Sequence, residues 1–161
     1  MTRLRAGDAA PDFDLADQTG ARWRLKDLAG KRVILYFYPA DDTPGCTAQA
    51  CDFRDARDDL AASGYVILGV SPQNRGSHDA FARKYSLNFP LLVDDRSETA
   101  RRYGAVAEKR NGHERVPRRI KRSTFVIDEK GAILEALYGV KARGHVGSLA
   151  DRLGISEISA G

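Results

Sequence analysis

The sequence predicts an α/β protein with a mixed central sheet flanked by helices. Two apolar runs, VILYFY (33–38) and YVILGV (65–70), are rich in β-branched and aromatic residues, which is typical of strands buried on both faces. Strand-like and helix-like segments alternate through the middle of the chain, and hairpin patterns stand at both ends. The chain has 161 residues and shows no linker or repeat, so we expect a single domain, 1–161.

The N-terminal third is expected to form a hairpin, a buried strand and a long helix. Residues 11–25 alternate apolar and polar side chains around a Gln-Thr-Gly turn, which predicts a β-hairpin with Trp23 in the core. The first buried strand ends at Pro39. Residues 47–62 carry apolar side chains at helical spacing, and Gly64 is typical of a helix stop.

The rest of the chain continues the alternation of strands and helices. The expected elements are strands at 65–70 and 90–93, helices at 78–85 and 97–103, paired strands at 123–128 and 132–138, and a helix at 145–153. Parallel sheets carry their sites at the carboxyl ends of their strands. We therefore expect the functional residues just after the strand 33–38.

Composition and charge are typical of a soluble protein, and we expect no membrane partner. Hydrophobic residues make up 42% of the chain, charged residues 30%, and the formal net charge is +4. The N-terminus lacks the apolar core of a signal peptide, and the longest apolar run is too short to span a bilayer. We therefore expect a cytoplasmic location. A zinc site is a poor interpretation, because the chain has three scattered histidines and only two cysteines.

One segment, 108–122, departs from the average composition with seven Lys or Arg in fifteen residues, EKRNGHERVPRRIKR. It fits either a solvated loop or an electrostatic contact with nucleic acid or another acidic partner. The segment lacks the interleaved aromatic side chains that stack on bases, so the solvated loop is favoured and we expect no nucleic acid partner.

The stretch Thr43-Pro44-Gly45-Cys46 has the pattern of a helix start. Threonine suits the N-cap and proline the first helical position, so Cys46 lies in the first turn. Unpaired N–H groups and the helix dipole favour an anion there, and a thiolate is such an anion. The alternative is that Thr43 is only a cap and Cys46 only a small buried hydrophobic residue.

The second cysteine, Cys51, follows Cys46 by five residues. On one regular helix their Cα atoms would lie roughly 8 to 9 Å apart, whereas a disulfide needs about 7 Å or less. The pair could therefore bond only after the first helical turns unwind, which suits a catalytic cycle better than a static cross-link. Two unrelated buried cysteines remain the alternative.

The motif as a whole resembles a known family. PADDTPGC (39–46) is similar to the Pro-x-x-x-Thr-x-x-Cys signature of the peroxiredoxins, and YFYPADDTPGCTAQAC (36–51) resembles their bacterioferritin comigratory protein, or PrxQ, subfamily. Further similarity lies in APDF (10–13), SPQNRGSHDAFARKYSLNFPLLVDD (71–95) and RSTFVID (122–128). The resemblance implies a thioredoxin-like fold with an N-terminal β-hairpin extension.

The resemblance also implies an enzyme, a thioredoxin-dependent peroxidase of the atypical 2-Cys type. Cys46 would attack hydrogen peroxide or an organic hydroperoxide as a thiolate and become a sulfenic acid. Cys51 would then form an intramolecular disulfide with Cys46, and thioredoxin or a similar dithiol would reduce it. No metal, haem or flavin is implied. Because the second cysteine lies on the same chain, we expect a monomer.

The family signature implies roles for four further residues. Pro39 would shield the sulfur, and Thr43 would hydrogen-bond the peroxide. The backbone N–H groups of Gly45 and Cys46 would help to hold its oxygens. Arg122, which matches the arginine before the Thr-Phe strand, would lie beside the thiolate, stabilise it and polarise the peroxide.

The sequence leaves two points open. A thiol-based redox sensor uses the same chemistry and is an alternative function, whereas the absence of a CxxC motif disfavours general disulfide exchange. The segment 108–122 departs from its relatives, which often carry an aromatic-containing stretch there. Gln49 stands where relatives carry Glu or Gln, and we expect it to help order the first helical turn.

Overall fold

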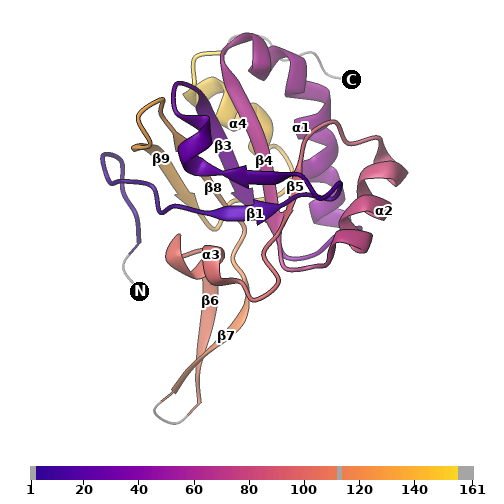
Figure 1. The fold of residues 1–161 in the computed structure, drawn as a ribbon, viewed down its shortest axis with the longest axis vertical. Helices are drawn as coiled ribbons and strands as arrows, with labels where there is room; N and C mark the ends of the chain where they lie inside the picture. The colour runs from indigo at the N-terminus through magenta and orange to yellow at the C-terminus, as the bar shows by residue number, and fades with distance from the viewer. Residues whose placement is uncertain (1–2, 112–113, 156–161) are drawn as a thin grey trace.

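The central sheet brings the two apolar runs side by side. The computed structural model describes residues 3–111 and 114–155, and in it five strands form one sheet in the order β5-β4-β3-β8-β9 (Figure 1). β3 pairs in parallel with β4, which pairs in parallel with β5, while β8 runs antiparallel to both β3 and β9. The sheet is therefore mixed, as predicted.

Apart from one short 3-10 turn and one additional pair of strands, the elements follow one another in the order expected from the sequence. The strands are β1 (Asp14–Ala16), β2 (Arg22–Arg24), β3 (Arg32–Phe37), β4 (Tyr65–Ser71), β5 (Leu91–Val93), β6 (Val106–Asn111), β7 (Glu114–Ile120), β8 (Ser123–Ile127) and β9 (Ile133–Tyr138). The helices are the 3-10 turn η1 (Leu25–Leu28) and α1 (Pro44–Ala62), α2 (Arg75–Tyr85), α3 (Glu98–Arg102) and α4 (His145–Arg152). The predicted N-terminal hairpin is the β1–β2 pair.

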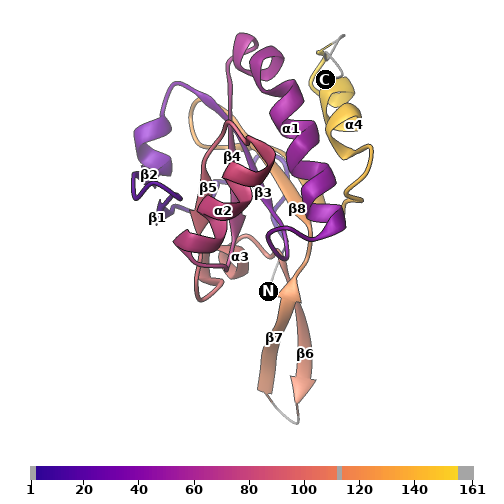
Figure 2. The ribbon, with the colours of Figure 1, turned by 90° about the vertical axis from the view of Figure 1, so that its right-hand side faces the viewer.

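Each face of the sheet has its own core because side chains alternate along β3. Ile34 and Tyr36 pack with residues of α1, α2 and α4 on one face. Val33 and Leu35 pack on the other face with residues of η1, α3 and the segment before β1. Figure 2 shows α1 and α4 side by side on the first face. The long helix that carries both cysteines is therefore held against the sheet along its length.

Gly69 makes room for a large aromatic side chain beneath α1. It pairs with Tyr36 across β3 and β4. A Cβ at Gly69 would stand 3.0 Å from the Tyr36 ring and 3.1 Å from Leu91, closer than packing allows. The Tyr36 ring in turn stacks on Phe53 of α1 with centroids 4.6 Å apart. The absence of a side chain at Gly69 thus makes room for the ring on which Phe53 of α1 packs.

Two helices begin earlier than the apolar spacing predicts. α1 begins at Pro44 with Thr43 at its N-cap, as the capping pattern predicts, although its apolar spacing begins only at 47. α2 begins at Arg75 rather than at 78, because the Asn74 side chain caps it by accepting a hydrogen bond from the backbone N–H of Ser77 at 2.9 Å. First turns contribute few core contacts, so periodicity underestimates their extent.

The expectation that 108–122 is a loop is wrong. Residues of this segment form the antiparallel β6–β7 hairpin, in which Asn111 pairs with Glu114 and Val106 with Ile120. Figures 1 and 2 show that the hairpin projects away from the body of the protein. The overlooked signal is the Asn-Gly dipeptide at 111–112, which favours tight hairpins. The high charge of the segment favoured a loop and hid this hairpin signal.

None of the helices in 3–111 and 114–155 combines the length and the hydrophobicity that a membrane crossing requires.

Candidate functional site

The site forms where β3 ends and α1 begins. The chain leaves the sheet through Pro39, and Asp42 takes a left-handed conformation with φ +56°. Thr43 is extended, and its carbonyl accepts the first helical hydrogen bond, from Thr47 N–H at 2.8 Å. Gly45 and Cys46 therefore carry N–H groups of the first turn, which have no partner within the helix. These groups point from the helix start toward the place where a bound anion would lie.

Cys46 is buried beside a cation. Only 2% of the residue is exposed. The Arg122 guanidinium donates from Nη2 to the Cys46 sulfur at 3.4 Å and from Nη1 to Gln49 Oε1 at 2.6 Å. Gln49 lies one turn along α1 and is fully buried, so it fixes the orientation of the guanidinium. The arrangement holds a positive charge against the sulfur.

Gly45 makes room for the guanidinium. A Cβ at this position would stand 3.2 Å from Arg122 Nη2 and 3.4 Å from the Ala142 methyl group. Any larger side chain would push Arg122 away from Cys46 or move the segment after β9. The glycine is thus required for close approach rather than for an unusual backbone angle.

Thr43 and Pro39 lie on the same loop and make backbone-directed contacts. The Thr43 hydroxyl donates to the Ala40 carbonyl at 2.9 Å and makes no capping bond to α1. The Pro39 carbonyl accepts a hydrogen bond from Gln73 Nε2 at 3.1 Å. Pro39 and Arg122 both border a cavity of about 600 Å³ beside the base of the β6–β7 hairpin. The residues predicted from the signature are therefore gathered at one place.

Cys51 lies on the same uninterrupted helix as Cys46, and both cysteines are free. Helical geometry separates their Cα atoms by roughly 8 to 9 Å, beyond the span of a disulfide. Cys51 is half-buried, and this burial raises the pKa of its thiol above the ordinary value, although the nearby Arg54 opposes the effect.

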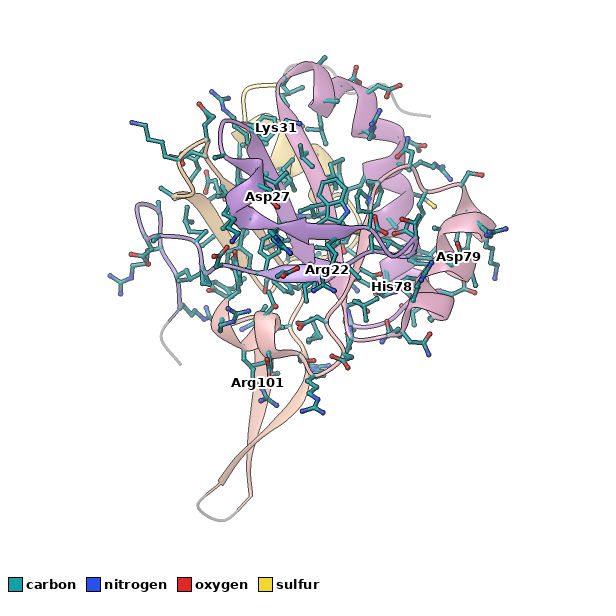
Figure 3. All side chains as sticks on the ribbon, in the orientation of Figure 1. Arg22, Asp27, Lys31, His78, Asp79 and Arg101 are labelled. Carbon is teal, nitrogen blue, oxygen red and sulfur yellow. The ribbon has the colours of Figure 1, made fainter. Side chains whose placement is uncertain are left out.

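Asp41 and His78 form a buried pair that the sequence reasoning missed. His78 lies on α2 (Figure 3), and its side chain is fully buried. Its Nδ1 lies 2.6 Å from Asp41 Oδ2 and its Nε2 lies 2.9 Å from the Leu92 carbonyl. A carbonyl only accepts hydrogen bonds, so Nε2 carries a proton and donates it to the Leu92 carbonyl. This pair attaches the loop before Cys46 to α2.

Other hydrogen bonds complete the anchoring of Asp41. The Tyr38 hydroxyl donates to Oδ1 and the Ser77 hydroxyl to Oδ2, both at 2.7 Å. Burial alone would raise the pKa of Asp41, but the bonds from His78 and Tyr38 outweigh it and lower the pKa. The sequence carries no spacing signal for this network, because Asp41 and His78 are 37 positions apart.

A second buried histidine, His145, begins α4 behind the site. Its Nε2 lies 2.8 Å from the Thr124 hydroxyl. Burial, helped by the positive charge of Arg122, lowers the pKa of His145 to about 4. His145 is therefore neutral at pH 7 and adds no second positive charge near Cys46. In 3–111 and 114–155, no group of three or more His, Cys, Asp or Glu is placed to hold a metal ion.

Comparison with known proteins identifies the family. The sequence profile of the AhpC/TSA family matches residues 6–136. The chain belongs to the AhpC/TSA family. Among its relatives, Peroxiredoxin Bcp of Bacillus subtilis is 42% identical over 144 residues, which cover 89% of this peroxiredoxin and 90% of the relative.

Solved structures agree with this assignment. Peroxiredoxin Q of Xanthomonas campestris superimposes with a TM-score of 0.82 at 34% identity, covering 88% of this peroxiredoxin and 90% of that chain. Peroxidoxin BcpB of Mycobacterium tuberculosis gives the same TM-score at 32% identity over 96% of this chain and 99% of its own. The predicted thioredoxin-like fold and the resemblance to the bacterioferritin comigratory protein and PrxQ subfamily are confirmed. The protein is an enzyme of the thiol peroxidase class.

Proposed function

We propose that Cys46 reduces hydrogen peroxide and organic hydroperoxides by direct attack. The thiolate sulfur bonds to the terminal peroxide oxygen while the O–O bond breaks. The sulfur loses two electrons and becomes a sulfenic acid, and the leaving alkoxide or hydroxide takes a proton from water. The observation that carries this proposal is the Arg122 guanidinium, 3.4 Å from the buried Cys46 sulfur at the start of a helix.

The surrounding groups suit the charge that develops in this step. Arg122 is placed to stabilise the thiolate and the departing oxygen, and the N–H groups of Gly45 and Cys46 supply further fixed donors. The Thr43 proton is committed to the Ala40 carbonyl. Its hydroxyl oxygen is therefore the acceptor for the O–H of a bound hydroperoxide. Pro39 shields the sulfur from water.

Cys51 completes the cycle as the resolving cysteine. After local unwinding of α1, the Cys51 sulfur attacks the sulfenic sulfur, an S–S bond forms, the S–O bond breaks and water leaves. Thioredoxin or a similar dithiol then reduces the disulfide, is itself oxidised, and returns Cys46 and Cys51 to thiols. The cycle needs no partner chain, so we propose a monomer of one domain that acts in the reducing cytoplasm.

The deciding experiment measures peroxide consumption with thioredoxin and its reductase, for the wild type and for Cys46→Ser and Cys51→Ser. We expect no activity in the first variant. In the second, we expect one reaction with peroxide, followed by loss of turnover unless external thiol is added. Mass spectrometry after one equivalent of peroxide should show that the wild type has lost two hydrogens. Full activity of the Cys46→Ser variant would exclude the proposal.

A further inference from the structure

One side chain from a distant part of the sequence holds the loop that leads from β3 to Cys46. Gln73 lies between β4 and α2 and is half-buried. Its Nε2 donates to the Pro39 carbonyl at 3.1 Å, and its Oε1 accepts from the Asp41 backbone N–H at 2.9 Å. These partners lie 34 and 32 positions away in sequence. A single amide group therefore bridges the backbone on both sides of Ala40.

The orientation of the Gln73 amide is fixed by its partners. The hydroxyl of Ser71, a buried residue at the end of β4, also donates to Gln73 Oε1. A backbone N–H can only donate a hydrogen bond, and a carbonyl can only accept one. Exchanging the oxygen and the nitrogen of the amide would set its NH₂ group against the Asp41 N–H and its oxygen against the Pro39 carbonyl. The amide therefore has one satisfactory orientation.

The peptide unit between Ala40 and Asp41 connects Gln73 to Thr43. Its N–H donates to Gln73 Oε1, and its carbonyl, which belongs to Ala40, accepts the Thr43 hydroxyl proton at 2.9 Å. A peptide unit is planar and trans, so its N–H and its C=O point in opposite directions. The bond from Gln73 at one end therefore directs the carbonyl at the other end toward Thr43.

We propose that Gln73 is a positioning residue for the attack on peroxide and that it acts through Thr43. The fixed Ala40 carbonyl takes the Thr43 proton, which leaves the Thr43 oxygen to accept the O–H of a bound hydroperoxide. Without the Gln73 amide, the peptide unit can turn and the Thr43 hydroxyl loses its single direction. This inference rests on the proposed peroxidase function and adds to it a residue that does not itself contact the peroxide.

The test measures the second-order rate constant for oxidation of Cys46 by hydrogen peroxide, in a Cys51→Ser parent that isolates the first step. Rapid-quench mass spectrometry follows the sulfenic acid. Gln73→Met keeps the length of the side chain and removes the amide. Thr43→Val removes the hydroxyl without removing a cap, because the Thr43 side chain makes no capping bond. We expect Thr43→Val to slow the reaction about tenfold and Gln73→Met about fivefold, the range set by one hydrogen bond.

The double variant separates positioning from a general structural role. If Gln73 acts through the Thr43 hydroxyl, adding Gln73→Met to Thr43→Val should slow the reaction by less than about twofold more. A fivefold effect of Gln73→Met with and without the hydroxyl would overturn the inference.

Alkylation of Cys46 by iodoacetamide supplies a second measurement, because it needs the thiolate but no acceptor from Thr43. Its rate in Gln73→Met should stay within about twofold of the parent. Alkylation slowed as much as peroxide reduction would mean that the cysteine itself is disturbed, and the inference would be wrong.

Gln18→Met is the matched control. Gln18 is also half-buried, and its amide makes the same kind of bridge at the start of β5. Its Oε1 accepts from the Leu91 N–H at 2.8 Å, and its Nε2 donates to the Phe89 carbonyl at 3.4 Å. This variant should keep the rate constant of the parent. Equal slowing by Gln18→Met and Gln73→Met would also refute the positioning role. If the Cys51→Ser parent does not react with peroxide, the proposed peroxidase function itself fails.

Discussion

Disulfide formation should accelerate when the helix between the cysteines is weakened. Ala48 lies on α1 between Cys46 and Cys51, is half-buried and touches none of the proposed catalytic groups through a recorded hydrogen bond. Replacing it with glycine removes helix propensity worth about 1 kcal/mol. The Ala48→Gly variant therefore lowers the free energy needed to unwind the segment that the two sulfurs must cross.

The expected magnitude follows from the geometry of the helix. The Cα atoms must close from roughly 8 to 9 Å to about 7 Å or less, so only the unwound population can form the bond. If unwinding precedes bond formation as a rapid equilibrium, a change of about 1 kcal/mol raises that population about fivefold. The rate of disulfide formation should rise by the same factor. The attack on peroxide should change little, because the folded form stays dominant.

The assay is rapid-quench mass spectrometry after one equivalent of hydrogen peroxide, with the sulfenic and disulfide forms distinguished by mass. Ala61→Gly is the matched control. Ala61 is exposed and lies near the C-terminal end of the same helix. The substitution at Ala61 removes the same helix propensity, but it does not weaken the helix between residues 46 and 51. Equal disulfide rates in the wild type and Ala48→Gly, or equal acceleration in both variants, would refute the unwinding mechanism.

Three further predictions concern the residues around the site. Burial raises the pKa of the Cys51 thiol. Iodoacetamide should therefore alkylate Cys51 more slowly at pH 7 than it alkylates a free cysteine, and faster as the pH rises. Peptide mass spectrometry measures the alkylation rate, and a rate at pH 7 equal to that of free cysteine would contradict the prediction. Gly45→Ala should displace the Arg122 guanidinium, because the added methyl group would stand 3.2 Å from it. Stopped-flow measurements should then show peroxide reduction slowed about tenfold. An unchanged rate constant would show that the position of the guanidinium is unimportant. His78→Leu removes two buried hydrogen bonds, one of them to Asp41. Urea unfolding should show that the free energy of unfolding falls by about 3 kcal/mol. A loss below about 1 kcal/mol at an unchanged m value would contradict the anchoring role of His78.

Much of the fold could be predicted because it is encoded locally. The apolar runs of β3 and β4, the hairpin of β1 and β2 and the helical spacing after Cys46 depend on neighbours within a few residues. The helix start at Thr43 and Pro44 was predicted for the same reason, since capping involves adjacent positions. The β6–β7 hairpin was missed because its charge was weighed more heavily than its turn dipeptide.

The candidate site was only partly predictable. The signature predicted that Arg122 would lie beside Cys46, and the guanidinium makes that contact across 76 positions of sequence. Nothing in the residues alone distinguished Arg122 from the other cations of the basic segment; the family resemblance did. The pair of Asp41 and His78 had neither a motif nor a spacing to reveal it.

The sequence by itself determined the order of the strands and helices outside the β6–β7 hairpin, the location of Cys46 at a helix start and the impossibility of a disulfide to Cys51 on an intact helix. These properties depend on helix geometry and capping, which act over a few residues. Only the tertiary structure decided which cation reaches the sulfur, which side chains hold the loop before it, and that cations from distant segments line one cavity. Such contacts form only when the sheet and its helices pack together, because chain segments far apart in sequence have no fixed distance until then.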